Sequence, residues 1–208
     1  MTDRLAVSAW LGEAIGAYDR PRAADIALTA IDDGSITIED LYRILSEIMV
    51  DIGEAWQRGT ADVWQEHLAS GVVRTIVESC ALLVEQAAPA SRTATVILAA
   101  PSEEYHDLGL RMLTDRFTLA GWRAHFLGAH APASELIAAI QELAADAVVL
   151  SASTHFHRVG LRDYVAQVSA SHPEVTVWVG GSAFAHAHDG WPIEMILDPR
   201  AIPVPGRE

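Results

Sequence analysis

A histidine in a short polar segment is the residue of this chain best placed for chemistry. The segment 104–109 (EYHDLG) follows an apolar run, residues 95–100, that predicts a buried strand. Imidazole is the commonest protein ligand for metals, and a carboxylate two residues away can hydrogen-bond its second nitrogen. Gly109 leaves room for a bulky group against the backbone. Glu104, His106 and Gly109 are therefore candidate ligand-site residues, although a helix-capping loop with a surface histidine has the same letters.

Two further pairs of candidate residues follow apolar runs. Ser151 and Ser153 follow the run 147–150, and Gly180 and Gly181 follow the run 175–179. In open parallel sheets, ligands bind outside the carboxyl ends of the strands, so these positions belong at one edge. A loop serine can also satisfy local backbone groups, and a glycine pair can simply end a strand.

A third group of candidates lies upstream, in helical sequence. Trp56 is followed after nine residues by Glu66 and His67, and Val63 lies between them. These residues could converge on the opposite side of a bound group. A tryptophan near a helix end is also commonly core, and a Glu-His pair on a helix is commonly a solvated face.

Together these motifs resemble those of the cobalamin-binding domains, whose pattern is D-x-H-x-x-G, then S-x-L or S-x-T, then G-G. The W-x9-E-H element narrows the resemblance to the adenosylcobalamin photoreceptors of the CarH type, and the resemblance covers residues 5–201. The resemblance implies that His106 is the lower axial ligand of cobalt. It also implies that the displaced nucleotide tail lies in a slot of an α/β domain.

The resemblance further assigns roles to the remaining candidates. Ser151 would contact the nucleotide or extend the hydrogen-bond chain from Glu104 and His106. Trp56 and Glu66 would hold the adenosyl group of adenosylcobalamin. The other assignments place His67 near the corrin edge, Val63 as a small apolar contact, and Ser153, Gly180 and Gly181 along the tail.

The chain departs from the family pattern at four positions. Glu104 stands for Asp and Ser153 for Leu or Thr, whereas Gln57 stands where light-responsive members can carry a histidine. Trp64 is bulkier than its usual counterpart. The cofactor could thus be adenosylcobalamin or methylcobalamin, with an adenosyl or a methyl group as the upper ligand. A flat tetrapyrrole other than cobalamin, such as heme or a bilin (biliverdin), would also fit such a cavity.

Four other histidines and the one cysteine have open roles. His155 and His157 follow the serine loop and His186 and His188 follow the glycine pair, so four imidazoles are expected near the pocket. Each also suits a polar loop; together they could bind a metal, pair with propionates or tune a chromophore. Cys80, among apolar neighbours, is expected to be a core thiol, with a covalent bilin link as the alternative.

The spacing of apolar residues predicts the helices and strands that position these candidates. The first ~90 residues predict a four-helix bundle, which forms a domain over residues 1–88. Residues 93–208 predict a second domain with a Rossmann-like (flavodoxin-like) parallel sheet. The predicted fold class is therefore α/β. The predicted helices are 6–18, 23–31, 37–57, 61–87, 106–120, 133–144, 158–171 and a short one near 182–188. The predicted strands are 95–100, 123–127, 147–151, 175–179 and a weaker one at 193–197.

Composition narrows the functional classes. The 208 residues carry 28 acidic and 14 basic side chains, a formal net charge of −14, which disfavours direct nucleic-acid binding. No apolar run approaches the ~20 residues that span a bilayer, and the first residues lack signal-peptide order. We therefore expect a cytoplasmic protein without the DNA-binding domain of CarH-type regulators, and no membrane association.

These features predict a stand-alone cobalamin-binding sensor, light-responsive and not an enzyme. It would act through homo-oligomer changes (dimer or tetramer) or a separate regulatory protein partner. A corrinoid methyl carrier of a methyltransferase system is the alternative. A photosensor that has switched to a bilin or another tetrapyrrole is the third hypothesis.

Overall fold

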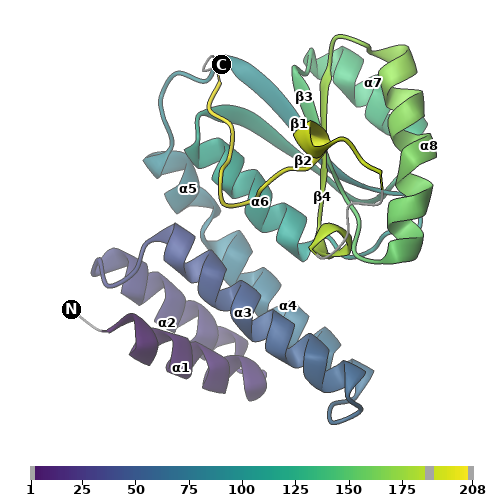
Figure 1. Ribbon diagram of the computed structural model, residues 1–208. Coiled ribbons are helices and arrows are strands. Elements are labelled where there is room, and N and C mark those ends of the chain that lie inside the picture. The colour runs from purple at the N-terminus through teal and green to yellow at the C-terminus, as the bar shows by residue number, and fades with distance from the viewer. Residues whose placement is uncertain (1–2, 186–189, 206–208) are drawn as a thin grey trace. The chain divides into compact units, whose positions relative to one another are not determined.

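The structure is a computed structural model, which describes residues 3–185 and 190–205 (Figure 1). The chain divides into two compact units, Met1–Gln86 and Ala87–Glu208. The first is helical and the second contains a four-stranded parallel sheet. The helical region followed by an α/β unit confirms the predicted fold class.

Five helices form the described part of the first unit. Caps set the beginnings of several: the Asp3 side chain accepts a hydrogen bond from the Leu5 N–H, and Thr37 and Asp40 form a capping box. The prediction of one continuous helix over 61–87 was wrong, because the chain turns at Cys80, whose N–H bonds to the Val77 carbonyl. The helices are α1 (Arg4–Gly16), α2 (Arg20–Asp32), α3 (Ile38–Gln57), α4 (Val63–Ser79) and α5 (Ala81–Ala87).

The core of the helical unit lies toward one end of the α3–α4 pair. Helix α4 packs against α1, α2 and α3, but the last buried residue of α3 is Leu45 and the first of α4 is Ala69. We call residues 46–68 the hairpin tip. No residue of the tip is buried, although it carries Trp56, Trp64 and several aliphatic side chains. Cys80 is fully buried, as expected for a core thiol.

One helical stretch, Val63–Ala87, is long and apolar enough to cross a membrane by length and composition alone. This finding qualifies the prediction that the chain has no such run. A helix that packs inside a soluble core satisfies the same criterion, and α4 contacts three other helices of its unit.

The second unit is a parallel sheet in the order β2-β1-β3-β4. Ser151 pairs with Gly180, and Leu150 with Ala99, so the strands end at a common edge. The strands are β1 (Ala94–Pro101), β2 (Trp122–Ala131), β3 (Ala147–Ser151) and β4 (Thr176–Gly180), and the helical segments are α6 (Leu108–Leu119), α7 (Ala133–Leu143), α8 (His155–Ser171), η1 (Ser182–Phe184) and η2 (Ile193–Met195).

The predicted fifth strand at residues 193–197 was wrong. Pro192 precedes a 3-10 turn that takes up Ile193–Met195, so only the next two residues reach the sheet. Ile196 forms a single parallel bridge with Val179, and the Leu197 N–H donates to the Val179 carbonyl at 2.9 Å.

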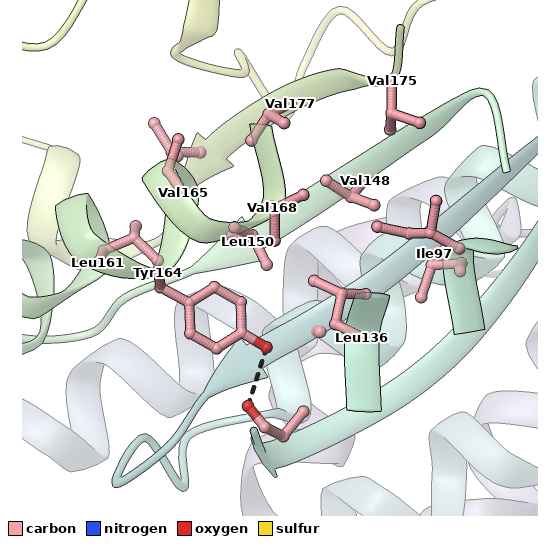
Figure 2. Packing of buried hydrophobic residues seen from close by; sticks show 14 of the residues in the cluster. Ile97, Leu136, Val148, Leu150, Leu161, Tyr164, Val165, Val168, Val175 and Val177 are labelled. Atoms are coloured by element: carbon pink, nitrogen blue, oxygen red, sulfur yellow. Dashed lines mark hydrogen bonds between the residues drawn. The ribbon is translucent and has the colours of Figure 1, made fainter. Parts of the chain in front are cut away.

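Apolar residues fill both faces of this sheet. One cluster lies between the sheet and helices α7 and α8 (Figure 2), and a second includes residues of α6. Because β1 and β3 are buried on both faces, their sequences are continuous apolar runs instead of alternating ones. The Tyr164 hydroxyl, which lies in the first cluster, donates to the Ala131 carbonyl at 2.9 Å, and burial raises its pKa to about 12.

Candidate functional site

The Glu104 carboxylate is the centre of the candidate site. A turn after β1 closes with a hydrogen bond from the Glu104 N–H to the Pro101 carbonyl and leaves the Glu104 side chain fully buried. Its Oε1 accepts from the His106 backbone N–H at 3.0 Å and lies 2.7 Å from the His106 Nδ1. Its Oε2 accepts from the backbone N–H and the hydroxyl of Ser153, each at 2.7 Å.

These bonds decide the charge of Glu104. Burial alone would raise the pKa of Glu104, but the hydrogen bonds from Ser153 and His106 outweigh it and lower the pKa to about 2. The carboxylate is therefore ionised near neutral pH and can only accept hydrogen bonds. A ring nitrogen that contacts it must then carry the hydrogen.

His106 consequently has one nitrogen available. With its Nδ1 engaged by Glu104, the Nε2 is the ring nitrogen left for a metal, and 73% of the side chain is exposed. A carboxylate behind an imidazole fixes the ring and raises its basicity, which is the usual arrangement of a metal-ligating histidine. His106 could thus bind a metal through Nε2.

His157 is a second imidazole on the same carboxylate. Its Nδ1 lies 2.7 Å from the Glu104 Oε2, and its side chain is only 16% exposed. The prediction that His155 and His157 lie in a loop was wrong, because α8 begins at His155 and not at Arg158. Thr154, whose side chain accepts from the His157 N–H, was the sequence signal for this earlier start.

The two serines lie at different places in the site. The side chain that joins Glu104 and His106 is that of Ser153, whose oxygen lies 3.0 Å from the His106 Nδ1. Ser151 ends β3 opposite Gly180, and its expected contact with the nucleotide stays a prediction.

Gly181 has a backbone reason to be glycine. Its φ is +99°, and a β-carbon there would lie 2.3 Å from the Ala152 carbonyl oxygen. The Ser182 hydroxyl donates to the Ser153 carbonyl at 2.9 Å, so the loops after β3 and β4 are tied together. A β-carbon at Gly180 would meet only the Leu197 carbonyl, at 3.9 Å, and one at Gly109 would meet no atom within 4 Å.

His130 also supports the site, and the sequence analysis missed it. The His130 Nδ1 accepts from the Glu103 backbone N–H at 2.9 Å, and the His130 backbone N–H donates to the Glu104 carbonyl at 2.9 Å. The Tyr105 ring stacks on it with centroids 5.2 Å apart. Because β2 was predicted to end at Leu127 and runs to Ala131, this contact had no sequence signal.

The upstream candidates lie on the hairpin tip of the other unit. Trp56 is 49% exposed near the end of α3, and Val63 begins α4. The Glu66 Oε1 accepts from the Ser70 hydroxyl at 2.6 Å, and its Oε2 lies 2.7 Å from the Nδ1 of His67. Trp64 donates to Asp62 and contacts the Tyr18 ring, which orients its indole within this unit.

The other histidines that the structure describes form no metal cluster. The Nδ1 of His155 lies 2.9 Å from Nη2 of Arg158, and His186 and His188 lie outside the described residues. Within residues 3–185 and 190–205, no group of three or more His, Cys, Asp or Glu could hold a metal. His106 could serve as the one protein ligand of a metal whose other ligands belong to a macrocycle.

Comparison with known proteins gives two family matches. Residues 94–191 match one family described as "B12 binding domain", and residues 10–80 match a second with the same description. The two matches together include all three groups of candidate site residues.

Two curated proteins of Myxococcus xanthus are similar to this chain. The HTH-type transcriptional repressor CarH is 34% identical over 173 residues, which are 83% of this chain and 56% of CarH. The HTH-type transcriptional repressor CarA is 32% identical over 130 residues, 62% of this chain and 41% of CarA. The chain thus spans about half the length of these relatives or less.

Among solved structures, the monomethylamine corrinoid protein of Methanosarcina barkeri has the same fold. Its TM-score is 0.75 at 18% sequence identity, over 90% of this chain and 88% of that chain. At this identity the likeness concerns the fold alone.

Proposed function

Because the chain belongs to the B12-binding domain family and cobalamin is its cofactor, we propose that it is a light-responsive cobalamin sensor. Sequence similarity to the repressor CarH supports a regulatory role over a catalytic one. Bound cobalamin would supply a cobalt atom with a light-labile upper ligand, the adenosyl group of adenosylcobalamin in this proposal.

The residues of the α/β unit fit such a group. The single observation that carries the proposal is the Glu104–His106 pair, in which a buried carboxylate leaves the exposed Nε2 of His106 free for an axial bond. Gly109 adds open space beside it. We propose that His106 binds cobalt, that Ser153 helps Glu104 hold it, and that the nucleotide tail lies along Ser151, Gly180 and Gly181.

We propose that Trp56 and Glu66 of the hairpin tip contact the adenosyl group, with Val63 and His67 beside them. The support for this proposal is the exposed apolar surface of the tip, which includes Trp56, Val63 and Leu68. Apolar surface in contact with water is unfavourable, so covering it with a ligand would lower the free energy. Loss of a group that covers this surface would expose it, so the covered and uncovered states would differ in what they bind.

Signalling would pass through association. We propose that light changes the homo-oligomer (dimer or tetramer) or the contact with a separate regulatory protein in the cytoplasm. A formal net charge of −14 opposes direct contact with a phosphate backbone, which favours a protein partner over DNA.

The proposal is tested by absorption spectroscopy and size-exclusion chromatography on the purified chain. The protein is loaded with adenosylcobalamin, methylcobalamin or hydroxocobalamin in the dark and then exposed to green light. We expect uptake of adenosylcobalamin, a light-induced spectral change and a shifted elution volume. Uptake of adenosylcobalamin with no light-dependent change in either readout would contradict the sensor role.

The second candidate function is that of a corrinoid methyl carrier. The observation in its favour is the fold shared with the monomethylamine corrinoid protein. A carrier would exchange methyl groups with a methyltransferase in the dark and keep the same elution volume under light. The experiment above therefore separates the two functions.

A further inference from the structure

We propose that His157 is a positioning residue for the axial ligand, acting through Glu104. It holds the carboxylate in the orientation that keeps the His106 Nδ1–H bound and the His106 Nε2 free. The inference rests on the proposed function, because the ligand role of His106 does.

Two imidazoles with opposite exposure share this one carboxylate. The His106 Nδ1 lies 2.7 Å from Oε1 and the His157 Nδ1 lies 2.7 Å from Oε2. The side chain of His106 is 73% exposed, whereas that of His157 is 16% exposed. One ring can therefore reach a ligand in solution, whereas the other is held inside the protein beside the carboxylate.

The first turn of α8 fixes His157. Its backbone N–H donates to the Oγ1 of the N-cap residue Thr154 at 3.2 Å, so its position is set by the helix start. Ser153, four residues earlier, places its hydroxyl 3.4 Å from the His157 Nδ1 and 2.7 Å from Oε2. Oε2 thus accepts two hydrogen bonds from Ser153 and lies 2.7 Å from the His157 Nδ1, whereas both Oε1 contacts come from His106.

This asymmetry gives His157 its effect on His106. His106 lies in the loop after β1. Its exposed ring lacks the packing that surrounds the His157 ring. The orientation of the His106 ring depends on the position of the Glu104 Oε1. That position is set by the contacts that hold the Oε2 of the same carboxylate. Without the His157 ring against Oε2, Ser153 alone would hold that oxygen, and the carboxylate could turn away from the His106 Nδ1. Outer partners of ligating histidines typically change metal affinity about 10- to 100-fold.

The first test uses the cobalamin-free full chain. Long-range ¹H–¹⁵N NMR spectra report which ring nitrogen of each histidine carries hydrogen. We expect His157 as the Nδ1–H tautomer in the wild type, and a loss of that preference in Glu104→Gln. In His157→Leu we expect His106 to shift from Nδ1–H toward a mixture of tautomers. An unchanged His106 ring in His157→Leu would overturn the inference.

The second test measures hydroxocobalamin affinity and the absorption spectrum of the loaded protein. His157→Leu should weaken binding on the order of 10-fold and reduce the fraction with histidine-ligated cobalt. His157→Asn should recover most of the loss, because its amide Nδ2–H stands as many bonds from the Cα as the histidine Nδ1. Wild-type behaviour of the leucine variant, or failure of the asparagine variant to recover, would refute the positioning role.

A matched control is available at the other end of α8. The Nδ1 of His172 lies 3.2 Å from a Glu174 oxygen, and its side chain is 15% exposed, close to the value for His157. His172→Leu should bind hydroxocobalamin as the wild type does, and an equal loss there would overturn the inference. If His157→Leu does not fold, His157→Asn and the wild-type NMR spectra still decide it. If the wild type takes up no cobalamin, the proposed function fails, whereas the tautomers separately decide the His157 contact.

Discussion

The Oε2 of Glu104 accepts two hydrogen bonds from Ser153, one from its backbone N–H and one from its hydroxyl, each at 2.7 Å. Strand β3 ends two residues earlier, so this pair joins the loop after β1 to the loop after β3. The site depends on this link between the two loops.

The hydroxyl of Ser153 should contribute to stability. Ser153→Ala leaves a buried carboxylate oxygen with fewer donors, and we expect a loss of about 1–3 kcal/mol in the free energy of unfolding. Urea denaturation followed by circular dichroism measures it. Ser151→Ala is the matched control and should change stability by no more than about 0.5 kcal/mol. Equal effects of the two substitutions would contradict the assignment of the contact to Ser153.

Stability should fall in acid because of Glu104. Its pKa is lowered from 4.5 to about 2 in the folded protein, so the folded state favours the ionised form. This contribution is present above the unfolded pKa and is lost as the pH falls from about 4.5 toward 2, with an upper bound of roughly 3 kcal/mol. Urea denaturation at several pH values should show a smaller acid loss in Glu104→Gln. Parallel profiles for the two proteins would speak against a depressed pKa.

Gly181 and Gly109 should respond in opposite ways to alanine. Gly181→Ala places a β-carbon against the Ala152 carbonyl at a φ of +99°, and we expect a loss of at least about 2 kcal/mol. Gly109→Ala meets no atom within 4 Å in helix α6 and should raise stability by roughly 0.5–1 kcal/mol. Thermal denaturation measures both changes. If Gly109→Ala weakens cobalamin uptake without a loss of stability, the open space there belongs to the cofactor site.

His106 should matter for binding and little for folding. Because its side chain is largely exposed, His106→Ala should change the free energy of unfolding by less than about 1 kcal/mol. Cobalamin affinity should fall by a factor of about 10 or more, with loss of the histidine-ligated spectrum. Equilibrium dialysis and absorption spectra measure the two effects. Undiminished uptake by this variant would contradict the axial role of His106.

The sequence predicted the elements whose burial is uniform. The runs 95–100 and 147–150 are strands buried on both faces, and the polar segments after them meet at one edge because the strands are parallel. Glu104 and His106 were predicted together because they are two residues apart, and the structure joins them directly.

Contacts between distant loops could not be predicted in the same way. His130 reaches Glu103 only because β2 continues to Ala131, and His157 reaches Glu104 only because α8 begins at His155. An error of three or four residues in an element boundary is enough to turn such side chains away from the site. The fifth strand failed for a related reason, since a 3-10 turn took the residues that would have extended it.

The unburied end of the α3–α4 hairpin has a consequence for motion. Helix α3 loses its buried contacts after Leu45, so its last three turns are held mainly by their own backbone hydrogen bonds. Such a segment opens at low free energy, and its amides should exchange with deuterium long before those of α1 or the buried half of α4. A ligand that covered these turns would stiffen them, and its departure would return them to rapid local opening.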